Sequence, residues 1–396
     1  MAGMSLPDSA TGDAARRAAI GLDTWLEHPH NRYSLLRASE FIPSAIWSPA
    51  GPPQEPRYPA AALLQRLRVP GAAGVATSAL DHLRATNSDS LLLYERGDLV
   101  AEWHSEGVDG ARPHLLFSIG KSITGVLAGI LIGDGLLDPD TQTADLVPQL
   151  RDSPAGAATV RQMLDMTVDL AYSETFDNSP SDFTRYRRAV WGGGPETLLD
   201  VVASLQAGPV GHGQVFRYVT PVTDVLGIAL EVVSGRRYVD LLAERLLAPL
   251  AMSGPVVTQV DRMGHARATG GISMTPRDLA RLGQCLMDGG RGPGGDQIVP
   301  RAWIDDMRHN GDRNAWLRGD CPEVLADGAY RSLWYAVPGG AFMATGIYGQ
   351  FLLCDPVSGR MIVRTSSRRV ASDAALTAAE LSALRALAEQ DWHAPA

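Results

Sequence analysis

The chain is 396 residues long, with 45% hydrophobic and 20% charged residues, as is usual for a globular protein with a large core. Its net charge of −9 and the lack of a basic stripe argue against a nucleic-acid-binding protein. The N-terminus has no apolar segment of the kind found in secretory signals, and the longest apolar run, at 122–137, is too short to cross a bilayer. We therefore expect a cytoplasmic protein that binds neither membranes nor nucleic acid.

The N-terminal part of the chain is rich in Pro, Ala and Arg and shows little periodicity. Residues 1–75 are therefore predicted to form an irregular arm with short helices that packs on the core, with an extended linker at 48–60. Residues 76–86 have helical spacing, and residues 90–107 read as two strands around a turn at 96–98.

The middle of the chain is predicted to be helical and rich in loops. A helix should begin at Ser118 and end near residues 133–135, and several further segments up to residue 265 have helical spacing. The best-marked helix follows this part, because Thr275 suits the N-cap, Pro276 the first helical position, and Gly289 the residue after the end.

The C-terminal part changes to short apolar runs, which predict strands at 332–337, 341–349, 350–355 and 360–366 before an amphipathic helix at 373–390. This order indicates an α+β fold in which both ends of the chain build one antiparallel sheet flanked by terminal helices. The arm would be followed by an α/β part, 76–117 plus 266–396, and by an inserted helical part, 118–265. The active site would lie between these two parts.

Several common sites are not predicted. Cys285, Cys321 and Cys354 are odd in number and form no CxxC pair, so we expect reduced structural thiols. The histidines lack the spacing of metal ligands, and residues 120–122, GKS, lack the first glycine of a phosphate-binding loop because position 115 is leucine. We expect neither a metal nor another cofactor.

Lys121 is the single lysine among 35 basic residues, and it follows Ser118 by three positions. Residues three apart share one face of a helix, so the amine can reach the hydroxyl. Arginine stays protonated, whereas a buried lysine can lose its proton and act as a base. A serine hydroxyl needs such a neighbour to become a nucleophile. The pair therefore predicts a nucleophilic Ser118 with Lys121 as its base.

Two further segments could complete this site. Tyr218 stands just before a predicted helix and could relay a proton, although a half-buried structural tyrosine is the alternative. Gly346 and Gly349 interrupt an apolar strand, which indicates either a bulge or a close approach of another group to the backbone. A strand edge at this point could offer a backbone N–H to an oxyanion, with the N–H of Ser118 as the second donor.

The order SIGK at 118–121, YVT at 218–220 and GIYG at 346–349 resembles the serine β-lactamase and penicillin-binding-protein superfamily, in its class C and esterase branch. Within it, residues 22–368 are similar to the 6-aminohexanoate-dimer hydrolases, which are amidases acting on nylon oligomers. This resemblance implies a β-lactamase/transpeptidase-like fold. It also implies that Ser118 is the nucleophile, Lys121 the base and Tyr218 the proton relay, while the amides of Ser118 and Ile347 form the oxyanion hole.

The resemblance also implies substrate contacts, and here the chain departs from those amidases. Tyr348 stands at a histidine position, Phe176 at a tyrosine position and Thr269 at an asparagine position. Thr220 replaces the asparagine of class C enzymes, and either Tyr186 or Arg187 takes the place of an amine-binding carboxylate. These departures make nylon-dimer hydrolysis doubtful as the main activity.

We therefore predict a serine hydrolase, a monomer or homodimer, that cleaves a small ester or linear amide through an acyl-Ser118 intermediate. An acyltransferase that passes the acyl group to an amine, and a sensor that acylates without turnover, are the alternatives. The loop at 175–194 carries Arg185, Arg187 and Arg188, which would favour an acidic substrate. The alternative for these arginines is that they face solvent and pair with Asp177 and Asp182.

Overall fold

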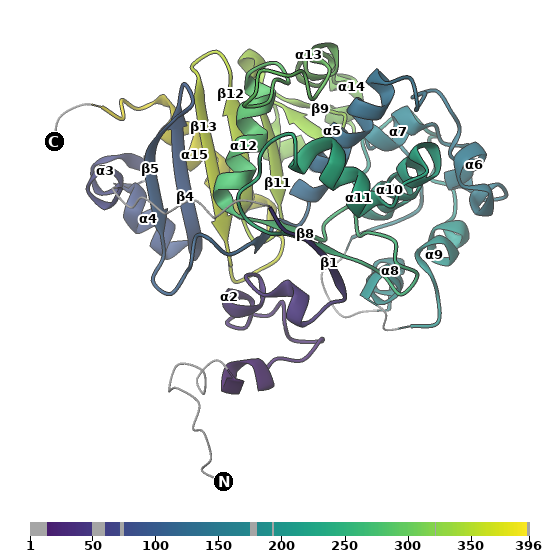
Figure 1. Ribbon diagram of the computed structural model, residues 1–396, viewed down its shortest axis with the longest axis horizontal. Helices are drawn as coiled ribbons and strands as arrows, with labels where there is room; N and C mark the ends of the chain where they lie inside the picture. The colour runs from purple at the N-terminus through teal and green to yellow at the C-terminus, as the bar shows by residue number, and fades with distance from the viewer. Residues whose placement is uncertain are drawn as a thin grey trace, which may run out of the picture.

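The structure is a computed structural model that describes residues 14–49, 60–71, 75–174, 180–191, 194–320 and 322–393. Its centre is a seven-stranded antiparallel sheet with the strand order β5-β4-β13-β12-β11-β10-β9 (Figure 1). The strands are β4 (Ser88–Glu95), β5 (Asp98–His104), β9 (Ala329–Arg331), β10 (Trp334–Ala336), β11 (Phe342–Gly346), β12 (Gln350–Asp355) and β13 (Arg360–Ser366). The early hairpin and the late strands thus form one sheet, as predicted.

The two halves of this sheet meet where β13 pairs with β4, with Val363 opposite Leu92. Helix α12 (Pro276–Met287) packs on β12 and β13, and α15 (Ala374–Glu389) also packs on β13. Gly283 of α12 faces Met361, whereas Glu380 of α15 binds Arg364. Side chains three residues apart on a strand point to opposite faces, so the two helices cover opposite faces of the sheet.

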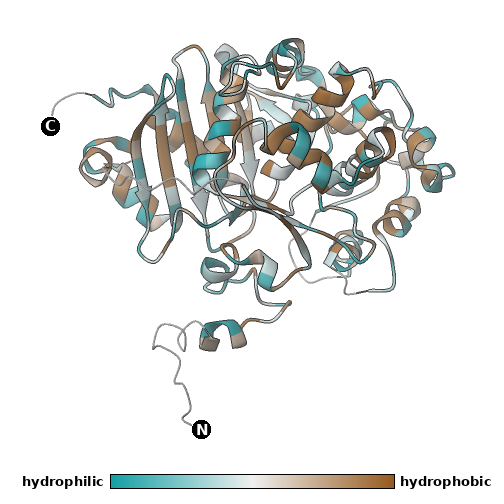
Figure 2. Cartoon of the chain, viewed as in Figure 1, coloured by the Kyte–Doolittle hydropathy of each residue, from teal (hydrophilic) through white to brown (hydrophobic). Residues whose placement is uncertain are grey.

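A mainly helical part lies beside the sheet (Figure 1). Its most buried helix is α5 (Ile119–Gly133), which contacts α10 (Thr220–Ser234) on one side and β11 and β12 on another. Because α5 is apolar along its length, it can be surrounded by both parts (Figure 2). The other helices here are α6 (Thr143–Leu146), α7 (Val160–Leu164), α8 (Asp182–Trp191), α9 (Leu198–Ser204) and α11 (Tyr238–Leu242).

The predicted helix starts and turns largely agree with the structure. Thr275 caps α12 by accepting the backbone N–H of Asp278, and α5 begins directly after Ser118. The turn between β4 and β5 contains Arg96 and Gly97, both with positive φ, which suits a tight hairpin. Outside the sheet and the helical part, the remaining helices are α2 (Asn31–Ser34), α3 (Ala61–Arg66), α4 (Ala79–Ala85), α13 (Arg301–His309) and α14 (Arg313–Leu317).

A second, four-stranded sheet differs from the expectation of an irregular arm and a mainly helical, loop-rich middle. It has the order β1-β7-β8-β6 and joins β1 (Ser44–Trp47), β6 (His114–Leu115), β7 (Val256–Gln259) and β8 (Ile272–Met274). β1 belongs to the predicted arm and β7 to the predicted helical part. Strands this short carry little periodicity, and their partners lie far away in the sequence. A two-stranded ribbon, β2 (Arg68–Pro70) with β3 (Ala76–Ser78), completes the strands.

Cys285 and Cys354 are buried free thiols, whereas Cys321 and most of the predicted linker at 48–60 lie outside the described residues. Among the helices that the structure describes, none has the length and apolar character needed to cross a membrane. The described part of the chain likewise contains no group of three or more His, Cys, Asp or Glu side chains that could hold a metal ion.

Candidate active site

Ser118 lies at the junction between β6 and α5, where the chain turns sharply. The residue before it, Phe117, has a φ of 48°, a conformation that is rare for a bulky side chain. Ser118 takes the N-cap position of α5, but its hydroxyl makes no capping hydrogen bond and is partly exposed. The hydroxyl is therefore available to other groups.

Lys121 lies one turn into α5 and reaches this hydroxyl. Its Nζ donates to Ser118 Oγ at 3.1 Å, and the side chain is only 1% exposed. Burial lowers the pKa of Lys121 to about 8, although the negative charges of Glu174 and Asp224 act in the opposite direction. A lysine with such a pKa is partly neutral at pH 7 and increasingly so toward pH 8, and the neutral amine can accept the serine proton.

Tyr218 contacts the same pair from the loop that precedes α10. The Lys121 Nζ lies 4.7 Å from the centre of the Tyr218 ring. Burial raises the pKa of the Tyr218 phenol well above its ordinary value, and a hydrogen bond with the side chain of Ser118 opposes this rise. The phenol is thus held in its neutral form, in which it can pass a proton rather than act as the base.

The hairpin between β11 and β12 lies against the residues before Ser118. A Cβ atom at Gly346 would stand 2.4 Å from the carbonyl oxygen of Leu116, so glycine allows this close approach. Tyr348 and Gly349 both have positive φ and make the turn. In the described chain, the backbone N–H groups of Ser118 and Ile347 donate no hydrogen bond. Two amides without an acceptor in the described chain, one at Ser118 and one in the hairpin that lies against the residues before it, are compatible with the predicted oxyanion hole.

Two buried carboxylates near Lys121 were not found by sequence reasoning. Glu174 Oε1 accepts the backbone N–H of Thr220 at 2.7 Å, and burial raises the pKa of Glu174. Asp224 is 1% exposed, and burial raises its pKa to about 6. Asp224 could have been found from the sequence, because a carboxylate inside the otherwise apolar segment 220–230 indicates a buried charge. The sequence gives no comparable signal for Glu174, because it lies in a loop.

The threonines predicted to contact substrate belong to this carboxylate network. Thr269 donates its backbone N–H to Asp224 Oδ1 at 2.8 Å and its hydroxyl to the Thr220 carbonyl at 3.3 Å. Both threonines are buried. Tyr186 is 0% exposed and donates its hydroxyl to Asp224 at 2.6 Å. Of the two residues predicted at that position, Arg187 is thus the one that remains partly exposed.

The other described residues predicted to contact substrate lie outside this carboxylate network. The Tyr348 ring packs on the ring of Phe117, the residue before Ser118, with their centres 5.2 Å apart. Arg185 forms ion pairs with Asp182 and Glu196, and Arg188 is exposed. Phe176 and Asp177 lie outside the described residues. The structure therefore packs Tyr348 against the residue before Ser118. On α8, Arg185 is paired, Arg188 is exposed and Arg187 is partly exposed.

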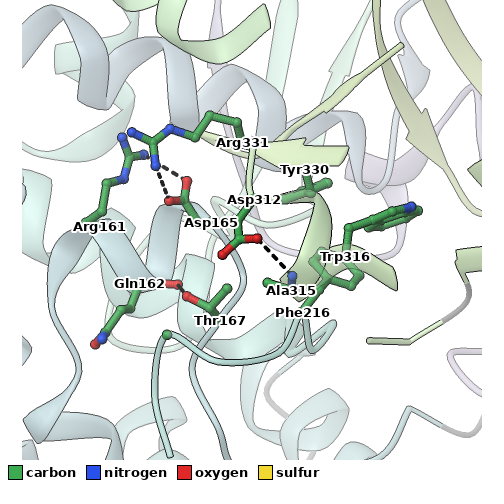
Figure 3. A pocket seen from close by; sticks show the side chains of 11 residues that line it. Arg161, Gln162, Asp165, Thr167, Phe216, Asp312, Ala315, Trp316, Tyr330 and Arg331 are labelled. Carbon is green, nitrogen blue, oxygen red and sulfur yellow. Dashed lines mark hydrogen bonds and ion pairs between the residues drawn. The ribbon is translucent and has the colours of Figure 1, made fainter. Parts of the chain in front are cut away.

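A pocket of about 210 Å³ lies on another side of Phe216, and its lining does not include Ser118, Lys121 or Tyr218 (Figure 3). The Phe216 ring is shared between the two regions, since it contacts both Tyr218 and Tyr330. The polar wall of the pocket contains Asp165, which pairs with Arg331 at 2.6 Å and with Arg161 at 3.2 Å. These paired charges indicate a structural network rather than a second reactive site.

Comparison with known proteins relates this geometry to one family. The family model described as Beta-lactamase matches residues 60–386. Among curated proteins, the chain is 33% identical to the 6-aminohexanoate-dimer hydrolase of Paenarthrobacter ureafaciens over 370 residues. The alignment covers 91% of this chain and 90% of that protein.

Solved structures share the fold. A structure from Bacillus anthracis, provisionally described as a 6-aminohexanoate-dimer hydrolase, aligns with a TM-score of 0.80 and 25% identity over 92% of this chain and 95% of that one. A D-stereospecific amidohydrolase from a Streptomyces species aligns with a TM-score of 0.57 and 18% identity over 82% of this chain and 98% of that one. The second likeness concerns the fold alone.

Proposed function

The chain belongs to the Beta-lactamase family, and from this premise we propose that it is a serine hydrolase that cleaves a small ester or linear amide through an acyl-Ser118 intermediate. The observation that carries the proposal is the 3.1 Å contact between Ser118 Oγ and a lysine amine that is fully buried and has a pKa of about 8. A serine hydroxyl in contact with an amine whose pKa is near neutrality can act as a nucleophile with that amine as its base.

In the first step, neutral Lys121 takes the hydroxyl proton of Ser118, directly or through the Tyr218 phenol, and Oγ attacks the substrate carbonyl carbon. The oxygen that becomes negative would be held by the amides of Ser118 and Ile347. The proton then passes to the leaving alcohol or amine as its bond to the carbonyl carbon breaks. Water attacks the acyl-enzyme by the same route, which releases the acid and restores Ser118.

The amidase at 33% identity supports a linear amide as one substrate type. The residues around the reacting groups differ from those that the resemblance implies for such amidases, because Thr269, Tyr348 and Arg187 stand where asparagine, histidine and a carboxylate are expected. We therefore propose that the reaction is shared and that the substrate is different.

Intact-mass analysis tests this proposal. After incubation with a fluorophosphonate, the wild-type chain should gain one phosphonyl group, and Ser118→Ala should gain none while keeping its fold by circular dichroism. Hydrolysis of p-nitrophenyl esters should be lost in the same variant. Labelling at another residue, or turnover by Ser118→Ala, would contradict the proposal. An acyl adduct that persists for hours would identify the sensor alternative, and amide formation with added amines the acyltransferase alternative.

Lys121 offers a second test of the same mechanism. Lys121→Arg keeps the charge but cannot supply a neutral amine, so it should lose on the order of 10²–10⁴ in kcat/KM, as Lys121→Ala should. Both variants should keep the buried helix intact. If Lys121→Arg retained activity, the lysine would serve only as a charge, and the proposed base would be wrong.

A further inference from the structure

Two arginines from distant parts of the chain meet on one tryptophan beside the candidate active site. The guanidinium carbon of Arg187, on α8, lies 5.0 Å from the centre of the Trp191 ring, and that of Arg267, just before β8, lies 5.1 Å from it. The two cations can be no farther apart than these distances combined. Burial and the nearby charge of Arg267 lower the pKa of Arg187, as expected for like charges placed close together.

These groups carry unused hydrogen-bond donors. Within the described residues, Arg187 forms no ion pair or hydrogen bond, whereas Arg185 on the same helix is paired with Glu196 and Asp182. Arg267 donates to Gln259 at 3.3 Å, but its Nε is buried without an acceptor, as is the Trp191 Nε1. Buried donors are nearly always satisfied, so the Arg267 Nε and the Trp191 Nε1 call for an acceptor, and the partly exposed Arg187 lies beside them.

In the described structure, the carboxylates around these groups are not bound to either arginine. Glu174 and Asp224 interact electrostatically with Lys121 and Arg267, and Asp23 interacts with Arg187. Within the described residues, none of these carboxylates forms an ion pair with either arginine. An anionic ligand would supply the missing ion pair and gain from the partly desolvated position of the guanidinium groups.

The arginine pair lies close to the reacting groups. Trp191 packs in the same apolar cluster as Phe117, Ile347 and Tyr348. Phe117 precedes the nucleophile, and Ile347 carries one of the two free amides. Arg187 also interacts electrostatically with Tyr348. An anion held at Trp191 would therefore belong to the same substrate whose carbonyl carbon reaches Ser118.

We propose that Arg187 and Arg267, together with the Trp191 N–H, bind the carboxylate of the substrate, so that the enzyme acts on esters or amides that carry a second, anionic carboxyl group. Guanidinium groups match this ligand because their planar donors suit the two oxygens of a carboxylate. The inference rests on the proposed function, since it concerns the substrate of that site. Of the three arginines that the sequence suggested as binding groups for an acidic substrate, only Arg187 is retained, and Arg267 is added to it.

Three p-nitrophenyl esters of equal acyl length test the inference: the hexanoate, which is neutral, the adipate monoester, which is anionic, and the 6-aminohexanoate, which is cationic. For the wild type at low salt, kcat/KM should be higher for the anionic than for the cationic ester by about tenfold or more, the usual effect of one hydrogen bond to a charged group. High salt should reduce this ratio. Adipate itself should inhibit hexanoate ester hydrolysis competitively.

The variant Arg187→Gln should remove most of the preference and raise the inhibition constant of adipate, while hydrolysis of the hexanoate ester shows that the protein is folded and active. Arg188→Gln is the matched control, because Arg188 is the exposed neighbour on α8 and should leave all three rates unchanged. Arg267→Gln should act in the same direction as Arg187→Gln.

The outcomes separate this inference from the function on which it rests. If Ser118 does not turn over even the neutral ester, the proposed hydrolase function fails. If the neutral ester is hydrolysed through Ser118 but the anionic and cationic esters react equally at low salt, the carboxylate site is refuted and the function stands. A preference that survives Arg187→Gln unchanged would also refute it.

Discussion

Lys121 and the carboxylates around it make the candidate site sensitive to pH. A buried lysine with a pKa of about 8 is mostly protonated at pH 7, and its neutral fraction increases as the pH rises through that value. Acylation by the proposed mechanism needs the neutral amine. The activity toward a neutral ester should therefore rise with pH and level off above about 8.

Glu174 should set where this rise occurs. Its negative charge is the largest of the effects that raise the pKa of Lys121, so removing the charge in Glu174→Gln should lower that pKa and move the inflection of log kcat/KM to lower pH. Glutamine can still accept the Thr220 N–H that Glu174 accepts at 2.7 Å. The measurement is a pH–rate profile with the neutral hexanoate ester, which avoids titration of the substrate.

Glu106→Gln serves as the control for that profile, because Glu106 is exposed and lies outside the site. It should leave the inflection in place. A profile of Glu174→Gln that coincides with the wild type, or that moves to higher pH, would mean that Glu174 does not act on Lys121.

Helix α5 carries Ser118 and Lys121 between the sheet and the helical part, and its glycines permit this close packing. A Cβ atom at Gly125 would stand 2.2 Å from the carbonyl oxygen of Ser332. That backbone is held in place, because Ser122 donates to Leu333 O at 2.7 Å and Ser332 N donates to Asp165 at 3.0 Å. A methyl group at Gly125 would have to displace a fixed carbonyl.

Gly125→Ala should therefore lower the free energy of unfolding by about 1–3 kcal/mol, as in other overpacked cores. In an ordinary helix the same change would instead raise the stability by about 1 kcal/mol. Urea unfolding followed by tryptophan fluorescence measures the change. Gly283→Ala on α12 is a control with a smaller expected loss, since its Cβ would meet the flexible Met361 side chain at 2.4 Å. Equal or greater stability of Gly125→Ala would contradict this account of the packing.

At the scale of the whole molecule, a buried charge network holds the terminal helix to the sheet. Glu380 on α15 pairs with Arg364 on β13 at 3.1 Å and with Arg368 at 2.9 Å, and all three side chains are buried. Arg364 also donates to Ser88 on β4 at 2.9 Å. The network thus joins the last helix to strands from both ends of the chain.

Glu380→Gln should leave two buried arginines without a carboxylate and lower the free energy of unfolding by about 3–5 kcal/mol. Asp327→Asn is the matched control, because Asp327 pairs with Arg385 of the same helix at 3.5 Å but is exposed, and such pairs contribute less than about 1 kcal/mol. Urea denaturation of both variants gives the comparison. Similar losses in the two variants would show that burial does not decide the contribution of Glu380.

Much of the fold was accessible from the sequence because its signals are local. The N-cap at Thr275, the turn at 96–98 and the apolar helix after Ser118 each depend on residues a few positions apart. The strand β7 and the strand β1 were missed, because each is four residues long and is stabilised by the other. The division into an arm, an α/β part and a helical part remains a prediction.

The sequence by itself determined that Ser118 and Lys121 can touch, because three residues of helix bring them to one face, and it predicted for the lysine a role that arginine could not fill. Only the tertiary structure decided which charges surround that lysine. Glu174, Asp224 and Arg267 come from three separate segments and act on Lys121 because folding places them in one poorly solvated region, where electrostatic interactions are strong. Within the described residues, the same folding paired Arg185 with carboxylates and placed Arg187 beside Arg267 without an ion pair. Residue spacing along the chain cannot encode such differences, since they depend on burial and on partners distant in sequence.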